Sequence, residues 1–142
     1  MKKTKLVVNY DYDFDLYGMI SPSKEYTLAW HLNRGLGIRL VKEADMQFEV
    51  AGQRTVYISN YVCHCQHYIV RLLRNKPAEG AGTGFAWLLP ELKEFDYFLL
   101  LQGHHNLFDG PEHRQHLNNL AVIQYFTKID TANLKNRENL IF

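Results

Sequence analysis

The chain has little of what marks membrane, secreted or nucleic-acid-binding proteins. It contains only two cysteines, and its 16 Lys and Arg against 15 Asp and Glu give a formal charge of +1. No apolar run approaches the roughly 20 residues of a membrane-spanning helix, and the apolar residues 6–8 are too few for a signal peptide. A charge near zero argues against a nucleic acid as partner. We therefore expect a cytoplasmic protein with no membrane partner.

The composition that remains is that of an ordinary globular domain. Apolar residues make up 46% of the chain and charged residues 22%, a balance typical of proteins that bury a hydrophobic core. A chain of this length buries roughly 70% of its unfolded surface on folding. We expect residues 1–142 to form a single domain that needs no disulfide, metal or cofactor.

Hydrophobic periodicity in the first half predicts a strand, a helix and then more strands. Alternating apolar and polar residues over 6–16 predict a half-buried strand that ends at Gly18. Ser21 as N-cap, apolar residues at helical spacing and then Gly37 predict a helix over 22–35. Beyond the helix, β-type residues predict a hairpin and two further strands, at 38–41 with 46–50, at 56–58 and at 68–73.

The second half continues this mixture of strands and helices. Residues 95–101 are nearly all apolar, as in a central strand covered on both faces. Asp109 with Glu112 has the spacing of a capping box and predicts a helix to residue 119, and 122–129 predict a last strand. Short connections favour antiparallel pairing. The expected fold is α+β, with two main helices and a largely antiparallel sheet of about six or seven strands, in the order β-α-β-β-β-β-β-α-β.

The distribution of apolar residues over the predicted strands also suggests self-association. Two helices cover about one face of such a sheet, yet several predicted strands, such as 68–73 and 95–101, are apolar on both faces. We expect the uncovered apolar surface to meet another protein, most simply a second copy in a two-fold homodimer. The leading hypothesis is a non-enzymatic interaction protein.

Seven histidines are many for this length and support an alternative function. His113 and His116 share a face of the predicted helix, and the preceding loop could bring His104, His105 and Asp109 to them. Imidazole and carboxylate groups are ligands that zinc takes, although no H-E-x-x-H motif is present. The alternative hypothesis is a metal-binding protein or metal-dependent enzyme built on residues 104–116.

Two further patterns favour structural interpretations. Cys63 and Cys65 point the same way on a strand but lie too far apart to bridge without distortion, so we expect free thiols. Asp11, Asp13 and Asp15 have the spacing that opens a calcium loop, but the glycine and glutamate that such a loop requires are missing. A solvated acidic strand face is the favoured interpretation. No serine lies in G-x-S-x-G, and we assign no catalytic residue.

A nine-residue motif links the chain to a known family. The run Leu89-Pro90-Glu91-Leu92-Lys93-Glu94-Phe95-Asp96-Tyr97 resembles the consensus of the IPExxxVDY family of small bacterial proteins, known mainly from Bacteroidetes-type organisms. Pro90, Glu91, Asp96 and Tyr97 match, whereas Leu89 and Phe95 stand where the family has Ile and Val. The ending 138–142 is also similar. The resemblance implies a small bacterial protein and no particular activity.

The motif itself predicts a tight turn entering the central strand. Pro90 fixes the backbone at the start of the turn. Phe95 and Tyr97 are expected on one face of the strand, with Asp96 on the other. A carboxylate at the mouth of an apolar strand needs donors, which we expect from the backbone of the turn or from a nearby arginine.

Overall fold

The computed structural model describes residues 14–50, 54–76, 87–104, 106–134 and 140, without the side chains of 48–50, 54–56 and 133. These residues form two α-helices and one antiparallel sheet of six strands, which confirms the predicted α+β class. The strands are β1 (Phe14–Ile20), β2 (Val41–Val50), β3 (Arg54–His64), β4 (Ile69–Arg74), β5 (Tyr97–Gln102) and β6 (Tyr125–Ile129). The helices are α2 (Glu25–Leu36) and α3 (Pro111–Asn118), with 3₁₀ turns η1 (Pro90–Leu92) and η2 (Thr131–Asn133).

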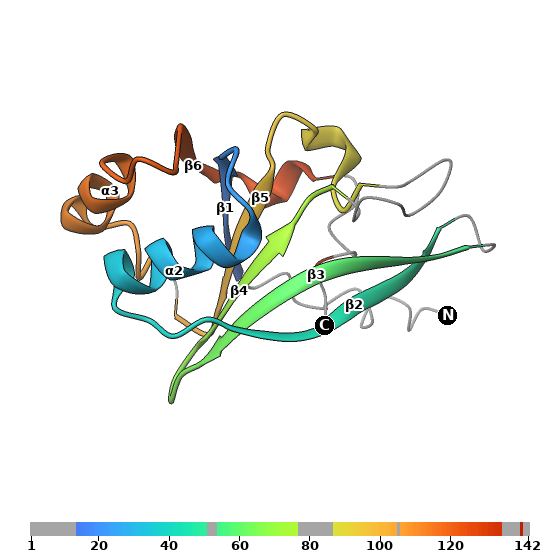
Figure 1. The fold of residues 1–142 in the computed structure, drawn as a ribbon, viewed down its shortest axis with the longest axis horizontal. Helices are drawn as coiled ribbons and strands as arrows, with labels where there is room; N and C mark the ends of the chain where they lie inside the picture. The colour runs from blue at the N-terminus through green and yellow to red at the C-terminus, as the bar shows by residue number, and fades with distance from the viewer. Residues whose placement is uncertain (1–13, 51–53, 77–86, 105, 135–139, 141–142) are drawn as a thin grey trace, which may run out of the picture.

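The sheet order is β2-β3-β4-β5-β1-β6, and all neighbours are antiparallel. The predicted central strand, β5, lies between β4 and β1. Figure 1 shows α2 beside α3 at one end of the molecule, with the β2–β3 pair extending away from them. None of the described helices has the length and apolar character needed to cross a bilayer.

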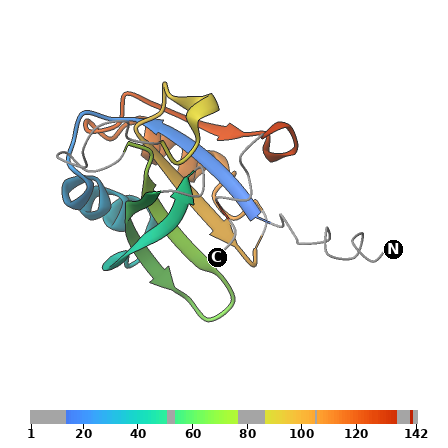
Figure 2. The same cartoon turned by 90° about the vertical axis from the view of Figure 1, so that its right-hand side faces the viewer.

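Two hydrophobic cores lie on the two faces of the sheet. The first packs α2 and α3 against strand residues such as Val70 and Leu99. The second packs Leu89 and Leu134, from the segments around η1 and η2, against Phe98 and Leu100. Figure 2 shows α2 at the left and the red turn η2 at the right, with strands of the sheet between them. The expectation that the second sheet face leaves apolar surface uncovered is therefore wrong for these strands, because irregular segments of the same chain bury it.

The predicted hairpin of 38–41 with 46–50 is wrong, because β2 is one strand with a bulge. The register moves from Glu43 opposite Asn60 to Met46 opposite Ile58, so β2 carries one extra residue. The Asn60 side chain donates to the carbonyl of Ala44 in the bulge (3.4 Å). The polar run that indicated a turn is thus accommodated inside a longer strand, and the sheet has six strands.

The first strand continues past the predicted stop at Gly18; residues 1–13, which hold most of the predicted strand, lie outside the described residues. A Cβ at Gly18 would stand 2.7 Å from the ring of Phe95. Glycine is therefore needed here because the Phe95 ring lies close to β1, and it does not end the strand.

Both predicted helix caps are wrong, although both helices exist. Helix α2 begins after Lys24, because Ser21 instead donates its hydroxyl to the carbonyl of Val122 (2.5 Å). Helix α3 is capped by Gly110, because the carboxylate of Asp109 binds side chains of other elements. The predicted end of α2 at Gly37 is confirmed by its φ of 69° and its N–H bond to Asn33.

Candidate interaction surface and neighbouring sites

The motif residues form a buried corner where η1 leads into β5. Leu89 is fully buried in the second core, and Pro90 and Glu91 lie in η1. Phe95 belongs to the second core and Tyr97 to the first, so the prediction that they share one face is wrong. The chain turns into β5 only after Phe95, and strand alternation does not apply to this pair.

Asn75, just past the end of β4, holds this corner together. Its side chain is fully buried, donates to the carbonyls of Leu92 and Phe95 (both 3.0 Å) and accepts from the N–H of Leu89 (2.8 Å). Sequence reasoning missed this residue. Its partner Leu89 lies 14 residues further along the chain. In the sequence Asn75 is only an asparagine at the end of a predicted strand, and nothing near it distinguishes it from a loop asparagine.

Asp96 and Tyr97 connect the corner to the segment before α2. The carboxylate of Asp96 accepts from the N–H of Ser21 (2.9 Å), and the hydroxyl of Tyr97 donates to the carbonyl of Ser23 (2.6 Å). The donor in this contact is thus the backbone of a segment distant in the sequence, whereas we expected the turn backbone or an arginine. Burial raises the pKa of Tyr97 to about 12, so its hydroxyl stays a donor. A cavity of about 170 Å³ beside these residues is also lined by Arg74 and Lys76.

The structure does not gather the proposed zinc ligands. The ring of His104 lies edge-on to Tyr68, the ring of His113 packs against Phe108, and His116 is exposed on α3. His105 lies outside the described residues. Among the residues that the structure describes, no group of three or more His, Cys, Asp or Glu side chains is arranged to hold a metal ion.

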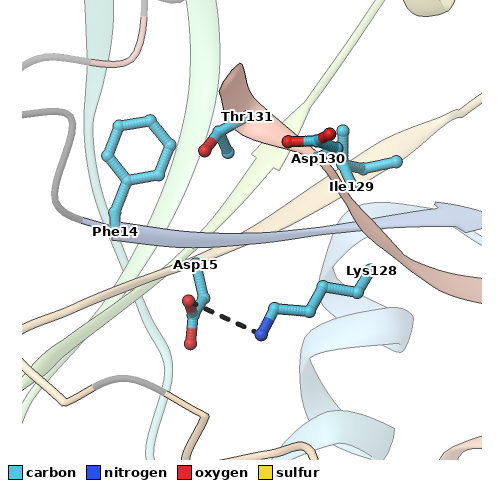
Figure 3. A pocket seen from close by; sticks show the side chains of 6 residues that line it. All are labelled: Phe14, Asp15, Lys128, Ile129, Asp130 and Thr131. Carbon is cyan, nitrogen blue, oxygen red and sulfur yellow. Dashed lines mark ion pairs between the residues drawn. The ribbon is translucent and has the colours of Figure 1, made fainter. Parts of the chain in front are cut away.

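Asp109 is the centre of a polar cluster between β1, β6 and the loop before α3. It accepts hydrogen bonds from the hydroxyl of Tyr17 (2.5 Å) and the ammonium of Lys128 (2.8 Å). Lys128 also lies 3.7 Å from Asp15, and Figure 3 shows this ion pair at a surface cavity of about 360 Å³. Asp15 is only 7% exposed and accepts from the N–H of Asn106. The predicted solvated acidic face is therefore wrong for Asp15; Asp11 and Asp13 lie outside the described residues.

The protonation states of this cluster follow from its contacts. Burial, together with the hydrogen bond to Asp109, raises the pKa of Tyr17 far above its usual range, so Tyr17 remains a donor. Burial opposes ionisation of Asp109, but the hydrogen bonds from Lys128 and Tyr17 outweigh it and hold the pKa of Asp109 below its ordinary value. Each charge faces an opposite charge or a donor, which indicates a cluster that stabilises the fold.

We expect Asp109→Asn to destabilise the protein by about 1 to 2 kcal/mol near neutral pH, because charge-assisted hydrogen bonds are lost. The folded state lowers the pKa of Asp109, so its contribution is present above the unfolded pKa and disappears as the pH falls through the folded pKa. Urea unfolding between neutral and acidic pH measures this. The control is Asp45→Asn, because the carboxylate of Asp45 forms an exposed ion pair with Lys42 (2.8 Å). We expect this substitution to change the free energy of unfolding by no more than about 0.5 kcal/mol. A pH-independent difference between the wild-type protein and Asp109→Asn would contradict the assignment.

A separate surface, which we call the aromatic surface, exposes two large aromatic side chains of α2, Tyr26 and Trp30. Their exposed fractions are 61% and 55%. Tyr26, Trp30 and Arg34 follow one another at four-residue spacing on the side of α2 opposite its buried face, and the Arg34 guanidinium lies 4.8 Å from the Trp30 ring centre. A helical wheel of the predicted helix would have found these residues.

Fold and surface together define a small α+β protein that exposes two large aromatic side chains on one face of α2. A scan against models of known protein families found no match, and a search of curated proteins found no relative.

Proposed function

We propose that this chain is a non-enzymatic interaction protein that forms a two-fold homodimer through the aromatic surface. The observation that carries the proposal is the exposure of Tyr26 and Trp30 on one helix face, each more than half exposed. Tyrosine, tryptophan and arginine are enriched at protein interfaces, where they supply most of the binding energy. Exposing such rings to water has no benefit for the isolated fold.

A second copy is a chemically suitable partner for this surface. In a two-fold interface every contact occurs twice: if one residue of the first chain contacts a second residue of the partner, that second residue of the first chain contacts the first residue of the partner. Arg34 and Trp30 already attract each other within one chain (4.8 Å), so two α2 helices packed antiparallel can exchange this cation–π contact and bury both rings. Each chain thus provides both halves of the interaction.

Pairing through the edge strand β2 is a poorer route to a dimer. β2 is bulged between Glu43 and Met46, and its exposed side chains include Lys42 and Asp45. Bulges and charges are the features that protect edge strands from pairing with other chains. The helix face is therefore the better interface.

We expect light scattering at high micromolar concentration to give the mass of a dimer for the wild-type protein. Trp30→Arg should weaken dimerisation at least about 30-fold, because an aromatic centre of the interface is lost and like charges meet across the axis. The matched control is Tyr125→Arg on the opposite edge strand β6, where Tyr125 is 51% exposed; it should remain a dimer. A monomeric wild-type protein at that concentration would exclude the homodimer, and a dimer that survives Trp30→Arg would exclude this surface.

The proposal extends to family and location. The motif at residues 89–97 supports membership of the IPExxxVDY family, and in the structure its apolar and polar members act together as one corner of the fold. Both cysteines are free thiols, which fits a reducing compartment such as the cytoplasm.

A further inference from the structure

Cys63 and Cys65 lie much closer together than their sequence spacing predicts. Their Sγ atoms are 3.1 Å apart, whereas side chains two apart on a regular strand do not meet closely enough to bridge. The reason is local. Strand β3 ends at His64, and the N–H of Cys65 donates to the carbonyl of Tyr68 (2.9 Å), which bends the chain back toward β4. The sequence analysis placed the two sulfurs too far apart to bridge without distortion. In the structure they lie closer together than that.

The two thiols have different surroundings. Cys63 is 5% exposed, packs in the first core, and its sulfur accepts a weak hydrogen bond from the N–H of Arg39 (3.5 Å). Burial, followed by the contact with Cys65, raises the pKa of the Cys63 thiol. Cys65 is only partly buried. A reagent from solvent therefore reaches Cys65 more readily than the buried Cys63.

We propose that Cys63 and Cys65 form a reversible dithiol–disulfide pair that exchanges with low-molecular-weight disulfides. The thiolate of Cys65 attacks one sulfur of the small disulfide, forms a mixed disulfide and releases one small thiolate. The thiolate of Cys63 then attacks the Cys65 sulfur, forms the Cys63–Cys65 disulfide and releases the second small thiolate. The protons of the two protein thiols end on the two small thiols, so the protein loses two electrons and the small disulfide gains them.

The geometry favours the second step in particular. The attacking Cys63 sulfur already stands 3.1 Å from the sulfur that it must reach, which is the separation of a near-attack arrangement. An unfolded chain must search for the same encounter, so folding should raise the equilibrium constant for closing the disulfide.

The test equilibrates the full-length protein with mixtures of reduced and oxidised glutathione, quenches with acid and reads the intact mass. We expect the folded protein to form the internal disulfide, seen as loss of two hydrogens, with an equilibrium constant at least about tenfold larger than that of the same protein in concentrated urea. An equal or smaller constant in the folded state would overturn the proposal, and so would a folded protein that gives only the glutathione adduct.

Two variants test the order of the steps. Cys63→Ser lacks the second thiol and should accumulate the glutathione adduct at Cys65. Cys65→Ser should react with glutathione disulfide at least about tenfold more slowly, because only the buried Cys63 remains. The reverse order of reactivity would overturn the assigned roles. Circular dichroism of both variants shows that the comparison is made on folded protein.

Discussion

Asn75→Ala is expected to lower the free energy of unfolding by about 3 kcal/mol. The Asn75 side chain makes three hydrogen bonds of 2.8 to 3.0 Å within the corner that carries the motif, and it is fully buried. Alanine would leave the buried N–H of Leu89, the buried carbonyl of Phe95 and the partly buried carbonyl of Leu92 without these partners, and the loss of each hydrogen bond costs about 1 kcal/mol. Chemical denaturation monitored by tryptophan fluorescence measures the change.

The control for Asn75 is Asn118→Ala, an exposed asparagine in the last turn of α3. We expect it to change stability by no more than about 0.5 kcal/mol. If Asn75→Ala behaved like this control, the three hydrogen bonds would not be what holds the motif corner in place.

Tyr97→Ala is expected to cost about 3 to 5 kcal/mol, which is the usual loss when a buried aromatic ring is removed. Tyr97 is buried in the first core, next to α2. Tyr97→Phe keeps the ring and removes only the hydrogen bond to the carbonyl of Ser23 (2.6 Å), so we expect it to cost about 1 kcal/mol. Thermal or urea unfolding of both variants separates packing from hydrogen bonding.

This pair of variants also decides what the motif is for. If the motif serves the fold, Tyr97→Ala destabilises the protein more than Tyr97→Phe does. If Tyr97→Ala left stability unchanged, the tyrosine would not serve the fold, and a binding role for the motif corner and its neighbouring cavity would become the better explanation.

The elements were predictable where a single stretch of chain determines them. The apolar run 95–101 predicts a strand buried on both faces, and β5 lies between β4 and β1 with both faces in cores. The spacing of Leu28, Leu32 and Leu36 predicts a helix, and Gly37 ends it. These predictions succeed because hydrophobic period and backbone freedom are local properties.

The predictions failed where a polar group had to choose among partners. Ser21 and Asp109 are good helix caps by residue type, yet Ser21 binds Val122 and Asp109 binds Tyr17 and Lys128. Their partners lie far away in the sequence, and a local pattern carries no information about which of two suitable hydrogen bonds will form.

The amino-acid sequence by itself therefore determined the fold class and the order of helices and strands, apart from the predicted hairpin that is one bulged strand, β2. Only the tertiary structure decided the sheet order, the burial of Asn75 and the 3.1 Å approach of the two cysteine sulfurs. The physical reason is that periodicity acts over a few residues, whereas pairing of strands and satisfaction of buried polar groups depend on contacts between distant segments.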